Sequence, residues 1–403
     1  MISNSQVLNI LSNGKPEPKN KKWYGEPNLG SYYGKEEINA VNKVLRDSKH
    51  WSNGFGPNSS EITTFEKDFA NYCNVKYSIA VSNNGDGFDM VLSTLNLTTK
   101  DEIIAPSINF KAWHMALHRY RCKMVFCDID INTMNIDLTD LEKKITSKTR
   151  LICPVHMGGI ACDVDKIDIL AKKYSKKYGT KICVVYDSAR AAGVNYKKSK
   201  VGNGGLCEIF SFHGAKLMTT FGEGGMITTN NKSLWNKLKE MQSYGGEYSW
   251  GLNYRMSKVE AAFGIEQLKR LDEMNNKRIR VAKRRISNLK GLKNIILPSN
   301  PDYSQSIYYL FPILVDTDWG YKERNYIIET LEKKYDIVCS IPKFINKRWK
   351  FISQNYGIPE LKNTEDFYNR VFCPIIHPLL NKKQELFISS AIINTINQIT
   401  FLK

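Results

Sequence analysis

One lysine stands out in this lysine-rich chain because its surroundings are almost uncharged. Lys216 lies in the segment SFHGAKLMTTFGEGG at 211–225, among small, hydroxyl and glycine residues. A lysine serves as a covalent catalyst only where its environment favours the neutral amine or an imine, and a neighbouring carboxylate would hold it as ammonium. Most lysines are solvated surface residues, so Lys216 indicates little without further evidence.

An aspartate at the end of an apolar run is a second candidate. The segment KICVVYDSARAAG at 181–193 predicts a buried strand that ends at Asp187. A carboxylate in such a place needs a partner. The protonated nitrogen of a pyridine cofactor fits, because the acid keeps the ring protonated and electron-withdrawing. The alternative is that Asp187 caps a helix that starts at 188–190.

A glycine-containing turn follows another predicted strand. In VSNNGDGFDM at 81–90, the glycines would let backbone N–H groups converge at a helix N-terminus, which suits a phosphate group. The hydroxyl groups of Ser211, Thr219 and Thr220 could donate to the same phosphate. Glycine turns also join strands to helices without a ligand, so this signal is weak by itself.

Other side chains offer aromatic or metal chemistry. Phe110 in PSINFKAWHMAL follows a predicted strand, where its ring could stack on a planar ligand or pack in the core. His114 and His118 have the i, i+4 spacing of a metal pair, but no third ligand is evident, so we expect a solvated helix face and no metal site. Cys153 and His156 are not expected to form a thiol–base pair, because residues three apart on a strand face opposite sides.

The segments that must position these residues are of two kinds, which differ in the spacing of their hydrophobic residues. From about 77 to 230, short β-branched runs alternate with segments of helical period. This pattern predicts βαβ units and a buried, mostly parallel sheet, and in such sheets the loops after the strands carry the site.

A long, highly charged helical segment begins near 256 and leads into a region with a different pattern. Beyond it, we expect strands in IYYLFPILVD (307–316), DIVCSIP and RVFCPII, and helices at 324–334 and 382–399. We therefore predict an N-terminal arm (1–28), a large α/β domain (29–256), and a connecting helix with a small α+β domain (257–403).

Composition narrows the class of protein. The 403 residues carry a net charge of +18, but the basic residues are scattered and no nucleic-acid motif accompanies them, so we expect no nucleic-acid partner. The nine cysteines lack CxxC spacing, which favours buried thiols in a reducing cytosol. No run of 18 apolar residues and no long N-terminal apolar stretch occurs, so we expect a cytoplasmic protein that does not span a membrane.

In their order along the chain, these segments resemble the DegT/DnrJ/EryC1/StrS family of sugar aminotransferases, which are fold-type I enzymes that use pyridoxal 5′-phosphate (PLP). The similarity extends from about residue 30 to 400. It is carried by GPNSSEITTFEKDFANYCNVKYSIAVSNNGDGFDM (56–90), CDIDINTMNIDLTDLEKKITSKTRLICPVHMGG (127–159), YDSARAAG (186–193), SFHGAKLMTTFGEGGMITTN (211–230) and GLNYRMSKVEAAFGIEQLKRL (251–271).

The resemblance implies a large domain with a mostly parallel seven-stranded sheet, a small C-terminal domain, and a homodimer with shared active sites. Lys216 is similar to the lysine that forms a Schiff base with PLP, and Asp187 to the acid paired with the pyridine nitrogen. Asn253 matches a residue that reaches the phosphate from the second subunit. The remaining cofactor-binding positions that it implies are the ring-stacking Phe110, Gly85, Asp86 and Gly87 at the phosphate, and the hydroxyl donor Ser211.

This chain departs from the family pattern at three positions. Asn84 and Gly85 replace the usual Gly-Thr of the phosphate turn, which removes a hydroxyl donor. Arg190 stands where the family usually has His or Gln near the PLP hydroxyl group, and a permanent cation there could lower a cofactor pKa or hold a substrate carboxylate or phosphate. Phe221 is an extra residue between Lys216 and the GEGG turn.

By this resemblance we expect an aminotransferase that moves an amino group from glutamate to a keto sugar, most simply a nucleotide-linked keto-deoxysugar. An inosose or another cyclic ketone is an alternative acceptor. Sugar dehydratases of the family resemble this chain except for a histidine in place of the lysine, so Lys216 favours transamination. A non-catalytic regulatory or binding protein on the same fold is the alternative from another class.

Overall fold

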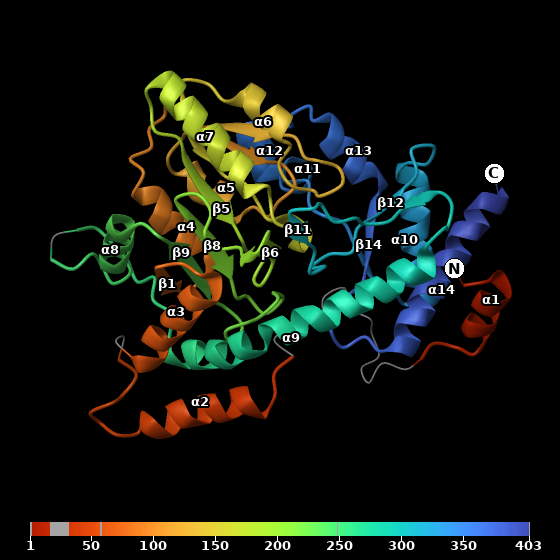
Figure 1. Cartoon of the computed structure of the whole chain (residues 1–403), viewed down its shortest axis with the longest axis horizontal. Helices are drawn as coiled ribbons and strands as arrows, with labels where there is room; N and C mark the ends of the chain where they lie inside the picture. Colours follow the sequence, from red (N-terminus) through yellow and green to blue (C-terminus); the bar gives the residue numbers. More distant parts are fainter. Residues whose placement is uncertain (1, 17–31, 57–58, 248, 403) are drawn as a thin grey trace.

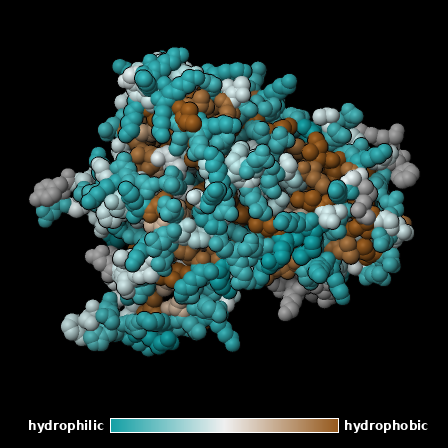
Figure 2. All heavy atoms as spheres, in the orientation of Figure 1, coloured by the Kyte–Doolittle hydropathy of each residue, from teal (hydrophilic) through white to brown (hydrophobic). Residues whose placement is uncertain are grey.

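The structure is a computed structural model that describes residues 2–16, 32–56, 59–247 and 249–402. Figure 1 shows a large central sheet covered by helices, and a long helix, α9 (Lys258–Leu289), that runs from this part of the molecule to a second, smaller layered region near both chain ends. Hydrophilic side chains cover most of the face shown in Figure 2.

The central sheet has seven strands in the order β1-β9-β8-β5-β4-β2-β3. Six strands run in one direction and only β9 is antiparallel to its neighbours. The strands are β1 (Tyr77–Val81), β2 (Glu102–Pro106), β3 (Lys123–Cys127), β4 (Thr149–Ile152), β5 (Cys183–Asp187), β8 (Cys207–Ser211) and β9 (Gly225–Thr229). The predicted mostly parallel, seven-stranded sheet is therefore confirmed.

Both faces of the sheet are buried, because its strands are apolar on both sides. Ile79 and Ile209 face one hydrophobic core, whereas Ala80 and Phe210, one residue further along each strand, face another. The helices that cover the two faces are α3 (Ser60–Cys73), α4 (Asn84–Ser93), α5 (Ala112–His118), α6 (Leu138–Lys144), α7 (Val164–Tyr178) and α8 (Lys232–Met241). This arrangement leaves the carboxyl ends of the strands as the place for a site.

The C-terminal region has its own sheet and core. The sheet has the order β10-β12-β14-β13, with β10 at Ile295–Ile296, β12 at Ile313–Val315, β13 at Cys339–Ser340 and β14 at Val371–Pro374. Helices α10 (Tyr321–Tyr335) and α14 (Lys382–Leu402) pack with it, and α1 (Asn4–Ser12) packs against α14. The fully buried Arg285 of α9 binds Glu385 of α14 at 2.8 Å and ties the long helix to this region.

Shorter elements surround these two cores. They are α2 (Lys35–Asp47), β6 (Asn195–Tyr196), β7 (Ser199–Lys200), β11 (Ser304–Gln305), α11 (Ile345–Arg348), α12 (Lys350–Tyr356) and α13 (Lys362–Arg370). Strands β11, β6 and β7 form a three-stranded sheet that joins residues near 304 to the large sheet's periphery. None of the helices described in the structure is long and apolar enough to cross a membrane.

The strand predicted at 307–316 is shorter than expected. Only β12, Ile313–Val315, joins a sheet, because the residues before it use their backbone elsewhere. The N–H groups of Ile307 and Leu310 donate to the carbonyl groups of Gly159 (3.0 Å) and Gly158 (3.2 Å). The domain boundaries at 28/29 and 256/257 stay a prediction, and residues 17–28 of the predicted arm lie outside the described residues.

Candidate functional site

The register of the sheet brings the ends of three strands together. Val81 at the end of β1 pairs with Gly225 of β9, which pairs with Ser211 at the end of β8. Asp187 at the end of β5 pairs with Ile209, two residues before Ser211. Val81, Asp187 and Ser211, each more than 20 positions from the others in the sequence, therefore share one edge, as predicted for the loops of a parallel sheet.

Asp187 is held rigidly but keeps one carboxylate oxygen open. Its side chain is only 3% exposed, and Oδ1 accepts a hydrogen bond from the Ala189 N–H group at 3.0 Å. Its backbone N–H group donates to the Pro154 carbonyl group at 2.9 Å, and its carbonyl group accepts from the His156 N–H group at 3.0 Å. Oδ2 accepts no hydrogen bond from the part of the chain that the structure describes. No helix begins at 188–190, where the chain makes a turn, so the alternative that Asp187 caps a helix is wrong. Asp187 closes this turn and still has an oxygen for a ligand.

Helix α4 begins directly after β1 and points its N-terminus toward the same edge. Asn83 is its N-cap, with Oδ1 accepting from the Asp86 N–H group at 2.9 Å. The Asp86 carboxylate is itself engaged by Asn83 Nδ2 (2.8 Å) and the Ser82 hydroxyl group, so it locks the turn. Within the described residues, the N–H groups of Asn84 and Gly85 have no acceptor, which leaves them for an anion.

Gly87 serves a different purpose from Gly85. A Cβ atom at Gly87 would lie 2.8 Å from Cγ2 of Ile209 on β8, so glycine lets α4 lie close against the sheet. At Gly85 a Cβ atom would meet only the Asn83 side-chain oxygen, at 3.1 Å. We therefore interpret Gly85 as the residue at the phosphate turn and Gly87 as a packing position behind it.

The loop between β8 and β9, residues 212–224, carries Lys216 and is braced by its own hydroxyl groups. Thr219 Oγ1 donates to the Phe212 carbonyl group at 3.0 Å, and the Thr220 hydroxyl group donates to the Glu223 carbonyl. These protons are used within the loop, so the expectation that Thr219 and Thr220 donate to a phosphate is wrong for this conformation. Ser211 Oγ accepts a long bond from the His213 N–H group (3.4 Å) and keeps its own proton available.

Lys216 and Arg190 meet at one aromatic ring. Lys216 Nζ lies 5.6 Å from the centre of the Tyr309 ring, and the Arg190 guanidinium carbon lies 5.9 Å from the same centre. The Tyr309 hydroxyl group donates to the carbonyl of Ala215, the residue before Lys216, at 3.4 Å. Arg190 Nη1 also contacts Asn109 Oδ1 at 3.5 Å. Sequence reasoning missed both residues, since nothing in the local segments signals that Tyr309 reaches the lysine loop or that Asn109 reaches Arg190.

Phe110 and Asn253 are both exposed at different edges of the site region. Phe110 is 41% exposed and touches Trp349 edge-on, with ring centres 5.7 Å apart at 89°. Core packing, the alternative for Phe110, is therefore excluded, while its stacking on a ligand stays a prediction. Asn253 is exposed and pairs through its backbone with Ser243. Its predicted role concerns a second subunit, so it also stays a prediction.

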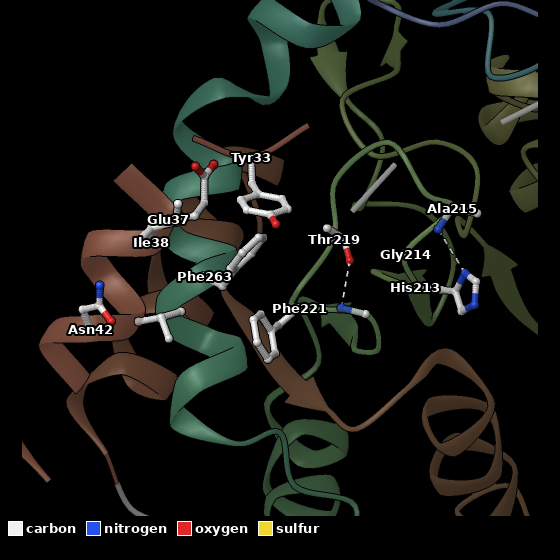
Figure 3. Close-up of a pocket in the computed structure, with 12 residues that line it drawn as sticks. Tyr33, Glu37, Ile38, Asn42, His213, Gly214, Ala215, Thr219, Phe221 and Phe263 are labelled. Atoms are coloured by element: carbon white, nitrogen blue, oxygen red, sulfur yellow. Dashed lines mark hydrogen bonds between the residues drawn. The ribbon is translucent and has the colours of Figure 1, made fainter. Parts of the chain in front are cut away.

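A pocket of about 740 Å³ adjoins the lysine loop on the side of α2 and α9. Figure 3 shows Tyr33, Phe263 and Phe221 turned toward one another between these helices and the loop. Phe221, the extra residue, has φ of +67° and lies 5.7 Å from the Phe263 ring. None of Lys216, Asp187 and Arg190 lines this pocket, so it is a neighbour of the candidate site rather than the site itself.

Two side chains considered for metal or thiol chemistry, His114 and Cys153, are fully buried. His114 is fully buried and stacks on Phe126 (5.8 Å, 12°), so the predicted solvated face for the His114/His118 pair is wrong. Burial lowers the pKa of His114 to about 3. The described residues contain no group of three side chains that could hold a metal ion. Cys153 is fully buried, and its burial raises the pKa of the thiol well above the usual value.

These features fit PLP. A buried acid with one open oxygen suits a protonated pyridine nitrogen, and the uncapped N–H groups at α4 suit a phosphate. Both lie on the strand edge from which the loop with Lys216 departs. The residues that would hold the cofactor are Asp187, Gly85, Ser211 and Lys216.

Comparison with known proteins agrees with this fit. A model of the DegT/DnrJ/EryC1/StrS aminotransferase family matches residues 31–392. The dTDP-3-amino-3,6-dideoxy-alpha-D-galactopyranose transaminase of Aneurinibacillus thermoaerophilus is 34% identical over 288 residues, which make up 70% of this chain and 76% of that protein. The GDP-perosamine synthase of Escherichia coli O157:H7 is 31% identical over 327 residues, 76% and 87% of the two chains.

Solved structures show the same relationship in three dimensions. The Helicobacter pylori protein PseC, an aminotransferase involved in the biosynthesis of pseudoaminic acid, superposes with a TM-score of 0.83 at 26% identity and covers 94% of this chain and 100% of its own. DesV of S. venezuelae superposes with a TM-score of 0.83 at 25% identity, covering 93% and 98%. This chain therefore belongs to the DegT/DnrJ/EryC1/StrS aminotransferase family, whose members depend on PLP.

Proposed function

We propose that this aminotransferase moves an amino group from glutamate to the keto group of a nucleotide-linked deoxysugar in amino-sugar biosynthesis. The observation that carries the proposal is the buried Asp187, with Oδ2 open, on the strand beside the one that leads through Ser211 to Lys216. Two relatives are named for dTDP- and GDP-linked amino sugars, which supports a nucleotide-linked acceptor. The net charge of +18 would help to attract such an anion.

The residues of this chain have distinct parts in the reaction. When bound, PLP supplies an electron sink for the carbon that loses its proton. Lys216 would take the proton from the Cα atom of the amino acid and pass it to the cofactor in the first half-reaction. In the second it would take a proton back from the cofactor and deliver it to the former keto carbon of the acceptor. Asp187 would keep a proton on the ring nitrogen. Gly85 and Ser211 would bind the phosphate, and Phe110 would pack against the ring.

A panel of acceptors tests the proposal. The purified protein loaded with PLP is incubated with glutamate or glutamine and with nucleotide-linked 4-keto and 3-keto sugars or inososes, and products are identified by mass spectrometry. We expect an amino sugar from a nucleotide-linked acceptor. Amination of inososes alone would replace this proposal by the cyclic-ketone alternative, and loss of water without amine transfer would indicate a dehydratase.

The colour of the purified protein distinguishes an active enzyme from the non-catalytic alternative. An active enzyme is yellow near neutral pH and bleaches when the correct amino donor is added, because the cofactor then carries the amino group. A colourless protein that gains no visible absorbance with added PLP would favour a regulatory or binding role on this fold.

We further propose a homodimer in which Asn253 of one subunit reaches the cofactor phosphate of the other. Asn253 lies in an exposed segment together with Tyr244, Trp250 and Leu252, each between 47% and 60% exposed. Large apolar side chains gathered on a surface mark interaction sites. The segment could therefore be covered by a second copy.

Mixing two inactive variants tests the shared site. Lys216→Ala and Asn253→Ala homodimers are each expected to be impaired. A hybrid dimer contains one site with an intact lysine from one chain and an intact asparagine from the other, so mixing should restore activity up to that of one site. Mixtures that stay inactive although light scattering shows a hybrid dimer would contradict shared sites.

We propose that the protein is cytoplasmic. All nine cysteines are free and seven of them are buried, which suits a reducing compartment. Cell fractionation with a tagged full-length chain would test this location.

A further inference from the structure

Arg190 is a buried cation with unusually few partners. Its side chain is 9% exposed, and no carboxylate of the described residues lies within ion-pair distance of it. Two other buried arginines have more partners among the described residues. Arg285 pairs with Glu385 at 2.8 Å. Arg324 donates through Nη1 to two backbone carbonyl groups at 3.1 and 3.2 Å, although its Nε atom has no partner there. Within the described residues, the Arg190 guanidinium makes one long hydrogen bond, to Asn109 Oδ1 at 3.5 Å. A guanidinium has five N–H donors, so most of its capacity is open.

The neighbours of Arg190 hold it in place without neutralising it. Asn109 is fully buried, and its Oδ1 accepts both from Arg190 and from the Phe110 N–H group (2.6 Å), which fixes the orientation of the amide. Among the described residues, the buried Asn109 Nδ2 has no hydrogen-bond partner. Holding the amide in this orientation therefore lowers the stability of the fold, which an amide with only a structural role would avoid. The Tyr309 ring contacts both cations. Its centre lies 5.9 Å from the guanidinium carbon of Arg190 and 5.6 Å from Lys216 Nζ.

A buried, uncompensated charge is costly in a folded protein and is usually matched by a ligand. A ligand of Arg190 must be an anion. It must bind in the region between Lys216 and Asp187, which is three residues before Arg190 in the sequence. The planar fork of a guanidinium suits two kinds of oxyanion in that region: the phenolate oxygen of PLP and the carboxylate of the amino donor.

We propose that Arg190 binds an oxyanion in the active site, and that Asn109 and Tyr309 are positioning residues that aim its guanidinium. The inference rests on the proposed function, because both oxyanions belong to the transamination reaction.

The test compares Arg190→Gln and Arg190→Lys with the wild-type protein, all loaded with PLP. Arg284→Gln is the matched control, because it removes a guanidinium on α9 that contacts the Leu380 carbonyl group, in the C-terminal region. Two quantities are measured: the pH midpoint of the visible absorption band without any donor, and the glutamate concentration that gives half-maximal bleaching in a single half-reaction.

The two oxyanions predict different results. A guanidinium beside the phenolate favours its deprotonated form, so Arg190→Gln should raise the pH midpoint by about one unit or more, with the glutamate dependence unchanged. If the oxyanion is the donor carboxylate, the half-maximal glutamate concentration should instead rise about tenfold or more while the midpoint stays constant. Arg190→Lys should recover part of either effect, and Arg284→Gln should show neither.

An Arg190→Gln protein that binds PLP and changes neither quantity would overturn the proposal. If that variant cannot be prepared with cofactor, Asn109→Ala decides, since it keeps the charge but removes its support and should shift the same quantity by a smaller amount. Both measurements are independent of the acceptor, so failure to aminate any sugar would refute the proposed function and leave the role of Arg190 measurable. A wild-type protein that does not bind PLP would refute both.

Discussion

The charge of Asp187 should control the chemical step, and Asp187→Asn tests this with little change of shape. Asparagine keeps an oxygen that can accept the Ala189 N–H bond now measured at 3.0 Å, but it cannot hold a proton on a pyridine nitrogen. The site is 3% exposed, so the interaction between the two charges is screened by protein rather than by bulk water.

The size of the effect follows from Coulomb's law. Two unit charges about 4 Å apart at an effective dielectric constant of about 20 interact by about 4 kcal/mol. Since about 1.4 kcal/mol corresponds to a factor of ten in rate, we expect the half-reaction with glutamate to slow by about 1,000-fold. The free energy of unfolding should change by less than about 1 kcal/mol, because the hydrogen bond and the volume are retained.

Stopped-flow measurement of the bleaching rate at saturating glutamate gives the chemical step, and a denaturant titration gives the stability. Asp168→Asn is a matched control: that carboxylate is also partly buried and accepts from Tyr186 at 2.9 Å, but it lies on α7 away from the strand edge. A rate within tenfold of wild type for Asp187→Asn, with PLP bound, would refute the role assigned to this residue.

Three further outcomes are expected. Lys216→Ala should lose the visible band of the bound cofactor and turnover, and a variant that retains both on spectrophotometry would contradict covalent attachment at this residue. Glu385→Gln should destabilise the protein by about 3–5 kcal/mol in denaturant titration, because it leaves the fully buried Arg285 without its counter-ion, whereas joint replacement of both partners by Met should cost much less. His114 is neutral when folded, with a pKa of about 3 against 6.5 in the unfolded chain, so stability is lost as the pH falls below 6.5. Between pH 6.5 and 5 the wild type should lose about 2 kcal/mol more than His114→Phe, and equal losses would show that His114 does not carry this dependence.

Much of the fold and part of the site could be predicted from local patterns. The alternation of apolar runs with helical segments was enough to predict the parallel sheet, because a strand buried on both faces must be apolar throughout. Polar residues directly after such runs, as at Asp187 and Ser211, then had to lie along one edge, and the register confirms that they do. The assignment of Lys216 and of PLP came from resemblance rather than from periodicity.

Burial of individual polar side chains could not be predicted in this way. His114 was expected to face water, but its helix is covered on that side and the ring stacks on Phe126. Likewise the apolar run at 307–316 predicted one long strand, yet residues 307–310 bond to the Gly158–Gly159 turn of the large domain. A hydrophobic pattern reports that a segment is buried, and it does not report which partner buries it.

The surroundings of Arg190 are the clearest case of what depends on the tertiary structure. Tyr309 is 93 residues from Lys216 and 119 from Arg190 along the chain, and it reaches them only because its segment crosses onto the large domain. The sequence showed an arginine three residues after Asp187. The packing showed that this arginine is buried and that no carboxylate of the described residues pairs with it. Residue type and spacing determine which chemistry a chain can support. Contacts between distant segments decide which charges are left open for a ligand, because only they set the desolvation and the partners of each group.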